Sequence, residues 1–319
     1  MNDPSQQHIG TPALIRRFAP YLMRYKRILI FDLFCAALTT LCDIVLPKIM
    51  SYLTNAATDP GIVLTVDAVL KLALLYLILR LIDGAAQYFM SGTGHIMGVY
   101  IETDMRRDAF AHLQRLSHTY YSNTKVGQIM GRITNDLFDV TEFAHHCPEE
   151  FFIAGIKIAA SFIILCWASV PLTLVVFACV PLMAVVSIKL NLKLRAAFRR
   201  QRFQIGELNA SIEDSLLGQR VVKAFAAEEE ENKKFEQGNT AFQTIKKKTY
   251  HAMAAFNTST RLFDGLMYLV VIVAGGLSLV YGTISAGDLV AYVLYVSTLI
   301  ATIRRIVEFA EQFQRGVTG

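Results

Sequence analysis

The chain has 319 residues, of which 54% are hydrophobic, and its mean hydropathy is +0.40. This composition is too apolar for a soluble domain of that size, so it excludes an ordinary soluble protein. The formal net charge of +5 does not indicate nucleic-acid binding, because no basic run is interleaved with aromatic residues. Contact with anionic headgroups of membrane lipid explains the positive charge more simply.

The first predicted element is a short amphipathic helix near the N-terminus. Residues 1–10 are polar and contain no apolar run, so they are not a secretory signal. In residues 11–27 apolar side chains alternate with basic ones such as Arg16 and Arg17, which is typical of a helix lying in the membrane interface. We therefore expect residues 1–27 to form a cytoplasmic segment that includes an interfacial elbow helix.

Six long apolar segments follow, and each approaches the ~20 residues that a helix needs to cross a bilayer. They are residues 28–50, 66–90, 151–170, 172–190, 262–281 and 289–306. The three short connections between them contain no Lys or Arg, whereas the N-terminal segment and the two long connections are rich in both. By the positive-inside bias, the basic stretches and both termini face the cytoplasm. The sequence thus predicts a multi-pass protein of the cytoplasmic (cell) membrane.

The two long connections share one pattern. The first continues span two with helical spacing to about Leu116, is interrupted at residues 121–131, and resumes as a helix near Arg132. The second continues span four, is interrupted at Gly218, and leads to span five. We expect an all-α membrane protein in which six transmembrane helices extend into the cytoplasm as two long helical hairpins. Their polar tips imply a binding partner.

Both tips carry recognisable motifs. Residues 116–136 read LSHTYYSNTKVGQIMGRITND, and residues 212–228 read IEDSLLGQRVVKAFAAE. These motifs resemble the cytoplasmic loops of the transmembrane domain of ATP-binding-cassette (ABC) exporters. Residues 282–289, with Arg304 and Arg305, resemble span six of the same family, and the resemblance covers residues 14–315. We therefore expect residues 28–315 to be a six-helix transmembrane domain, and residues 316–319 to be the start of a linker or a truncation scar.

The resemblance implies a mechanism and partners. In the family, each tip ends in a coupling helix, here near residues 117–127 and 214–221, that lies against a nucleotide-binding domain. Two six-span units form a homodimer or heterodimer, and spans four and five cross to the partner. ATP closes the nucleotide-binding domains and opens the cavity outward. The residues expected to couple the two domains are Tyr120, Tyr121, Gly127, Arg132, Asp136, Asp214, Gly218 and Arg220.

This chain is not expected to be an enzyme by itself. It contains no G-x-x-x-x-G-K-[ST] phosphate cradle, so we expect it to hold no cofactor. ATP and Mg would bind to a nucleotide-binding domain that is separately encoded or lost by truncation. The intact transporter would then be an ATP hydrolase.

Charged residues at membrane depth are a second group of candidates, because they are costly there and normally face a cavity or a partner. Glu142, His145, His146 and Glu149 stand at i, i+3, i+4 and i+7, on one face of a helix. Three interpretations are open: a polar network between helices, a patch that attracts a cationic substrate, and a His/Glu metal site. The metal site is the least favoured, because Pro148 disturbs the helix. The candidates for the cavity are Asp32, Asp43, Glu142, His145, His146, Glu149, Arg261 and Asp264.

The balance of these charges suggests a substrate class. Asp32 and Asp43 have no cation nearby in sequence, whereas Arg261 and Asp264 are spaced to pair. We therefore predict an acidic cavity and the export of a cationic or amphipathic substrate, either a small molecule or a peptide. The alternatives are a membrane sensor that binds a ligand or metal at the His/Glu face, and an ion channel. Thr302 stands where the family often has a proline, which predicts a straighter span six.

Overall fold

The computed structural model describes residues 11–318 except residues 60, 62 and 125. Within these residues the chain is helical and contains no β-strand, which confirms the predicted all-α fold. The chain divides into two compact units, one of Met1–Leu174 with Val271–Gly319 and the other of Val175–Val270. We call them the large unit and the hairpin unit, and each is described by itself.

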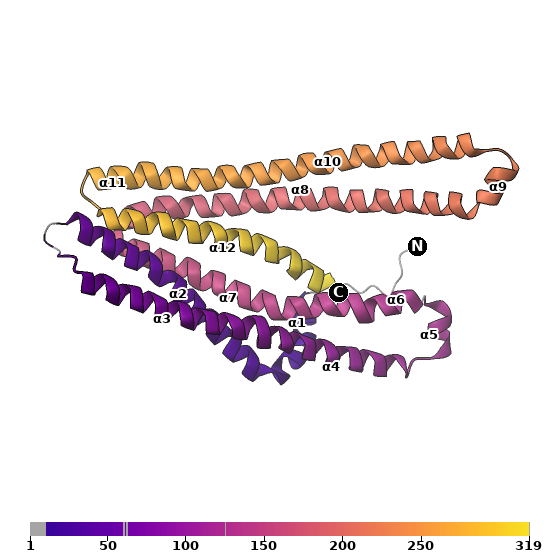
Figure 1. Ribbon diagram of the computed structural model, residues 1–319. Coiled ribbons are helices and arrows are strands. Elements are labelled where there is room, and N and C mark those ends of the chain that lie inside the picture. Colours follow the sequence, from indigo (N-terminus) through magenta and orange to yellow (C-terminus); the bar gives the residue numbers. More distant parts are fainter. Residues whose placement is uncertain (1–10, 60, 62, 125, 319) are drawn as a thin grey trace. The chain divides into compact units, whose positions relative to one another are not determined.

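The large unit begins with the predicted interfacial helix and contains most of the helices (Figure 1). In chain order they are α1 (Thr11–Arg24), α2 (Lys26–Thr58), α3 (Val66–Phe89), η1 (Met90–Gly94), α4 (His95–Leu113), α5 (His118–Asn123), α6 (Val126–Gly131), η2 (Arg132–Asp136), α7 (Leu137–Ala168), η3 (Val271–Gly275), α11 (Gly276–Val280) and α12 (Ala286–Thr318). The segments η1, η2 and η3 are π-helical turns that continue the neighbouring α-helices without a break.

The core of the large unit lies where α12 packs beside α2 and α7 (Figure 1). Tyr292 and Tyr295 of α12 are fully buried there. The Tyr295 hydroxyl donates a hydrogen bond of 2.7 Å to the carbonyl of Ile44 on α2. Nearer its N-terminus α12 approaches α2 through Gly287, whose added Cβ would lie only 2.1 Å from the carbonyl oxygen of Ser51. The absence of a side chain at Gly287 therefore sets the spacing of the two helices.

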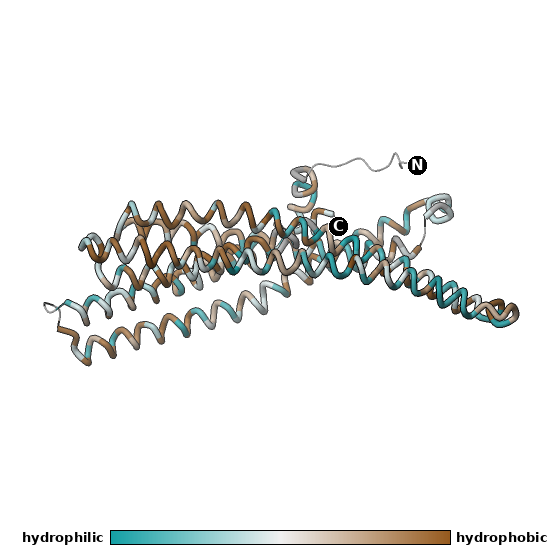
Figure 2. The backbone as a smooth tube through the Cα atoms, turned by 90° about the horizontal axis from the view of Figure 1, so that it is seen from above, coloured by the Kyte–Doolittle hydropathy of each residue, from teal (hydrophilic) through white to brown (hydrophobic). Residues whose placement is uncertain are grey.

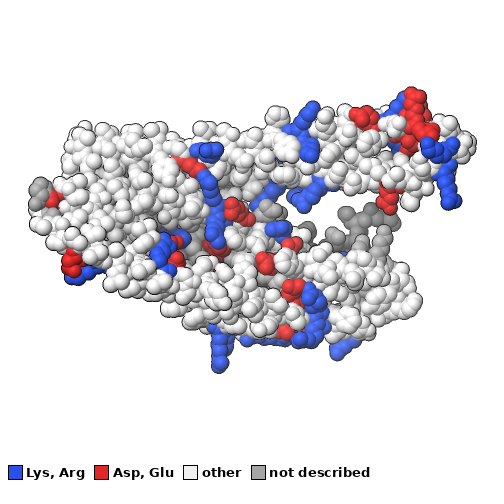
Figure 3. Space-filling model, in the orientation of Figure 1, with Lys and Arg blue, Asp and Glu red and all other residues white. Residues whose placement is uncertain are grey.

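The hairpin unit consists of two long helices joined by a short one. They are α8 (Val170–Leu217), whose first turn belongs to the large unit, α9 (Gln219–Ala224) and α10 (Glu228–Val270). The Thr249 hydroxyl of α10 donates a hydrogen bond of 3.3 Å to the Ala197 carbonyl of α8, which ties the two helices together. Hydrophilic residues dominate the part of the hairpin that approaches α9 (Figure 2), and charged side chains gather at that end (Figure 3).

Five helical segments of the described chain are long and apolar enough to cross a membrane. They are Lys26–Thr58, Ile129–Ala168, Val170–Leu217, Glu228–Val280 and Ala286–Phe309. The remaining predicted span corresponds to α3, which carries Asp67, Lys71, Arg80 and Asp83. The molecule is therefore a multi-pass membrane protein. α12 is one uninterrupted helix through Thr302, and its straightness stays a prediction.

Three predicted boundaries are wrong. α2 continues to Thr58 into the expected loop, where the Thr54 and Thr58 hydroxyls donate to carbonyls four residues earlier. The expected interruption at residues 121–131 is short, since α5 ends at Asn123 and α6 begins at Val126. The second short helix is Gln219–Ala224 rather than residues 214–221, because α8 stays helical until Gly218. At the end of α2, polar residues extend a helix that hydropathy alone would end.

Candidate functional site

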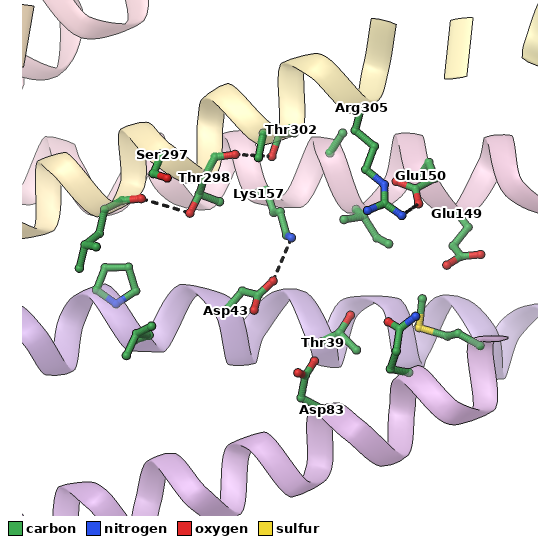
Figure 4. A pocket seen from close by; sticks show the side chains of 18 of the residues that line it. Thr39, Asp43, Asp83, Glu149, Glu150, Lys157, Ser297, Thr298, Thr302 and Arg305 are labelled. Atoms are coloured by element: carbon green, nitrogen blue, oxygen red, sulfur yellow. Dashed lines mark hydrogen bonds and ion pairs between the residues drawn. The ribbon is translucent and has the colours of Figure 1, made fainter. Parts of the chain in front are cut away.

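A cavity of about 560 Å³ lies within the large unit, between α2, α3, α7 and α12 (Figure 4). Apolar side chains such as Leu46, Ile153 and Leu294 form part of its wall, and the hydroxyls of Thr298 and Thr302 form another part. Its charged lining residues are Asp43, Arg80, Asp83, Glu149, Glu150, Lys157 and Arg305. The cavity thus combines an apolar wall with a dense set of charges, which suits an amphipathic molecule.

Most of these charges are paired with one another. The Lys157 ammonium lies 3.0 Å from Asp43, and the Arg80 guanidinium lies 3.4 Å from Asp43 and 2.9 Å from Asp83. Arg305 of α12 lies 2.6 Å from Glu150 of α7. Asp43, which has no cation nearby in sequence, is therefore paired through packing with one cation from α3 and one from α7.

One lining carboxylate is not accounted for by these pairs. Glu149 is only 7% exposed, and among the residues that the structure describes it has no hydrogen-bond or ion-pair partner. The four lining carboxylates face three cations, so the excess negative charge corresponds to one group. The lining is thus acidic by one charge, and most of the carboxylates that the sequence suggested for an acidic cavity are neutralised or lie elsewhere.

Asp32 of α2 lies close to this carboxylate but is not one of the groups that line the cavity. It is fully buried, and neither of its carboxyl oxygens has a hydrogen-bond partner in the described part of the chain. Ile153, one helical turn from Glu149 on α7, packs against the cluster that contains Ala36, one turn from Asp32 on α2, so the two carboxyl groups lie on facing parts of these helices. Burying an ionised carboxylate without a partner costs far more than burying a paired one.

The predicted His/Glu face divides between two places. Glu149 lines the cavity, whereas Glu142 lies 3.4 Å from Nε2 of His146 and accepts a hydrogen bond of 3.4 Å from Gln312 of α12. The His146 ring also meets the ring of His95 edge to face, with centroids 4.7 Å apart. Glu142 and His146 thus fit the polar-network interpretation. The side chain of His145 lies outside the described residues.

The other two candidates lie on α10. Arg261 is exposed and Asp264 is half-buried, and both belong to the hairpin unit rather than to the unit that forms the cavity. Their role in a substrate cavity remains a prediction. The described residues contain no group of three or more His, Cys, Asp or Glu side chains that could hold a metal ion.

The tip of the first hairpin is held by Tyr121. Its hydroxyl donates a hydrogen bond of 2.6 Å to the carbonyl of Leu113, so α5 is fixed against the end of α4. Tyr120 packs edge to face on Tyr121 with a centroid distance of 5.5 Å. Gly127 lies inside α6 and not in a tight turn. The other two candidates of this tip, Arg132 and Asp136, lie in the helical segment η2.

The second tip turns at Gly218. Its N–H donates a hydrogen bond of 2.9 Å to the Asp214 carbonyl, and an added Cβ would lie 3.1 Å from the same oxygen. Arg220 is exposed, and the Asp214 carboxylate lies 3.7 Å from Lys234. Sequence reasoning gave no role to Phe225, which is 79% exposed here. An apolar residue at a charged hairpin tip was the available signal for an interaction surface.

Known proteins share this organisation. Residues 29–303 match the ABC transporter transmembrane region. The "Uncharacterized ABC transporter ATP-binding protein YwjA" of Bacillus subtilis (strain 168) is 31% identical, over 96% of this chain and 53% of that protein. The "ATP-dependent lipid A-core flippase" of Chromobacterium violaceum is 23% identical, over 96% of this chain and 52% of that protein.

A further relative is the "Putative multidrug export ATP-binding/permease protein YgaD" of Bacillus subtilis (strain 168), which is 23% identical over 92% of this chain and 51% of that protein. This chain therefore spans about half the length of these relatives. The helical spans, the two hairpin tips and the match over most of the sequence agree with one another. The chain belongs to the family of the ABC transporter transmembrane region.

Proposed function

We propose that this chain is the membrane half of an ATP-driven exporter that moves an amphipathic substrate with a positively charged group out of the cytoplasm. The observation that carries the proposal is the cavity, in which an apolar wall faces one carboxylate, Glu149, that no described cation neutralises. The names of two relatives, a lipid A-core flippase and a multidrug export protein, support export as the direction.

ATP and Mg would be bound outside this chain, by nucleotide-binding domains at the cytoplasmic tips. The short helices α5 and α9 fit the role of coupling helices, since each lies at the end of a hairpin in the described chain. Val221 and Phe225, which are 60% and 79% exposed, offer an apolar contact surface at α9. A second six-span unit would complete a homodimer or heterodimer, with the termini of both units in the cytoplasm.

A displacement of the first tip can be transmitted to the cavity through one continuous helix, α7. α7 is a continuous helix from Leu137 to Ala168, and it begins next to the tip formed by α5 and α6. Glu149 and Lys157 lie farther along the same helix, in the cavity wall. A displacement of the tip by a closing nucleotide-binding domain would therefore shift both charges relative to α2 and open the cavity to the other side.

The test is ATP-dependent uptake of a lipophilic cation by inverted vesicles that contain the intact transporter. We expect uptake and stimulation of ATP hydrolysis by the cation. Phe225→Asp should abolish stimulation while leaving the basal hydrolysis of the nucleotide-binding domains. Phe235→Asp is the matched control, because Phe235 is 43% exposed on α10 and lies outside α9.

The absence of ATP-dependent uptake for every cation and amphiphile tested would contradict the exporter function. An equal loss of stimulation in both phenylalanine variants would contradict coupling through α9. The membrane-sensor alternative has no support, because the relatives carry the names of ABC transporter, flippase and export proteins.

A further inference from the structure

Two carboxyl groups of the large unit are buried and have no hydrogen-bond or ion-pair partner among the described residues. Asp32 is 0% exposed and packs beside the apolar cluster of Cys35, Ala36, Ala86 and Met90. Neither of its oxygens has a hydrogen-bond partner in the part of the chain that the structure describes. Glu149, which is 7% exposed, extends from α7 toward α2 in the cavity (Figure 4).

The charged and titratable groups around this pair come from three helices. Asp32 interacts electrostatically with His95 of α4. Glu149 interacts electrostatically with Asp32, with Glu150 of α7 and with Arg305 of α12. The Arg305 guanidinium is already bound to Glu150. Farther along the cavity, the other cations also form ion pairs. Lys157 pairs with Asp43, and Arg80 pairs with both Asp43 and Asp83.

Electrostatics then limits the charge that the pair can carry. An ionised carboxylate in a low-dielectric interior is costly without a partner, and a second negative charge close by raises that cost. Asp32 and Glu149 cannot both be ionised in this arrangement without a compensating positive charge. That charge is a proton on one carboxyl group, a proton on His95 beside Asp32, or a cation from the cavity.

We propose that Asp32 and Glu149 form a proton-exchange site for organic cations. Without substrate the pair holds a proton, and the cationic group of an entering substrate displaces it. The O–H bond of the carboxyl group breaks, the proton passes to water in the cavity, and the carboxylate forms an ion pair with the cation. The net charge of the site is unchanged, and nothing is oxidised or reduced. This inference rests on the proposed export function and assigns the substrate class of the same cavity.

The cavity wall favours an organic cation over a metal ion. Leu46, Pro47, Ile153 and Leu294 offer apolar contacts to a lipophilic body. A bare divalent ion would instead need several oxygen or nitrogen ligands at short distance, and the described residues present no group of three or more His, Cys, Asp or Glu that could hold one. Exchange for a proton would also let a cation enter the site without adding net charge to the membrane interior.

The test is calorimetry of tetraphenylphosphonium binding to the intact transporter in nanodiscs, in two buffers of different ionisation enthalpy. The difference between buffers measures the protons released on binding. We expect the wild type to release about one proton per bound cation, by the linkage of proton and ligand binding. Glu149→Gln and, independently, Asp32→Asn should bind the cation about tenfold more weakly, a loss of about 1.4 kcal/mol, and should release no proton.

Glu142→Gln is the matched control, since it removes a carboxylate of the same helix that is paired with His146. It should keep the proton release of the wild type. If one of the two test variants fails to fold, the other still decides the outcome. Failure of the wild type to bind the cation, binding without proton release, or an equal loss of release in Glu142→Gln would each overturn the exchange site. Failure to bind the cation would also count against a cationic substrate, whereas the other two outcomes leave export untouched, because export is tested separately by uptake in vesicles.

Discussion

Lys157 of α7 and Asp43 of α2, which are 114 positions apart in sequence, meet in the cavity wall with Nζ 3.0 Å from the carboxylate. The Arg80 guanidinium of α3 lies 3.4 Å from the same carboxylate and also forms an ion pair with Asp83. Three helices are therefore joined by one charge network at membrane depth. Each member of such a network stabilises the structure only while the others are present, because an isolated charge there is costly.

We expect Lys157→Met to destabilise the protein more than the double substitution Lys157→Met with Asp43→Asn. The single substitution leaves a partly buried carboxylate with only the longer contact to Arg80, and an unsatisfied polar group costs about 1–3 kcal/mol. The double substitution removes both charges. Thermal unfolding of the four members of this double-mutant cycle in detergent provides the measurement. Strictly additive shifts would show that Lys157 and Asp43 do not interact.

Gly287→Ala should destabilise the packing of α12 on α2. The new Cβ would lie 2.1 Å from the Ser51 carbonyl oxygen and 2.6 Å from Asn55, whose side chain accepts a hydrogen bond of 2.8 Å from the Gly287 N–H. Overpacking of this kind costs about 1–3 kcal/mol. Gly276→Ala on α11 is the matched control, because no atom lies within 4 Å of its added Cβ. The same melting curve for both variants would contradict the close approach.

The sequence was sufficient to predict the helical spans and the two hairpins with short helices at their tips, because hydropathic length and helical periodicity are local properties. Glu149 could be found by the rule that charges at membrane depth are functional. The same rule applied to Arg80 would have identified a second cavity residue that was missed. The pairing of Lys157 with Asp43 could not be predicted, since it depends on how α2 and α7 pack. For the same reason, the sequence could not separate the isolated Glu149 from the paired Asp43.

Attachment of the interfacial helix should depend on the ionisation of Asp104. Its carboxylate accepts hydrogen bonds of 3.1 Å from Arg24 and 3.1 Å from Tyr25, and the bond from Arg24 is the main cause that lowers the pKa of Asp104. A carboxyl group with a lowered pKa in the folded state stabilises it above the unfolded pKa of about 3.9. This stabilisation is lost as the pH falls through the folded pKa of Asp104.

The measurement uses spin labels at two exposed positions, Arg16 on α1 and His112 on α4. In the wild type the distance distribution should stay narrow at neutral pH and broaden in acid. Asp104→Asn should give the broad distribution already at neutral pH. Asp67→Asn, which removes an exposed carboxylate paired with Lys71, is the control. A narrow distribution in Asp104→Asn at neutral pH would mean that other contacts hold α1.

Tyr292 and Tyr295 are both fully buried on α12, yet loss of the hydroxyl should cost more at Tyr292. The Tyr292 hydroxyl lies 2.9 Å from the carbonyls of Leu165 and Ser169 and 2.8 Å from the Thr173 hydroxyl. These groups surround the turn where α7 ends and α8 begins. The Leu165 and Ser169 carbonyls also accept backbone hydrogen bonds from the Ser169 and Thr173 N–H groups, so the Tyr292 hydroxyl joins three polar groups of the turn into one network.

The Tyr295 hydroxyl instead donates to Ile44 inside α2, and the regular backbone hydrogen bonds of that helix remain when the hydroxyl is removed. We therefore expect Tyr295→Phe to cost about 0.5–1.5 kcal/mol, the usual value for one hydrogen bond, and Tyr292→Phe to cost more. Both variants keep the aromatic ring, so each controls for packing in the other. Equal thermal shifts, or a larger shift for Tyr295→Phe, would show that the turn between α7 and α8 does not depend on Tyr292.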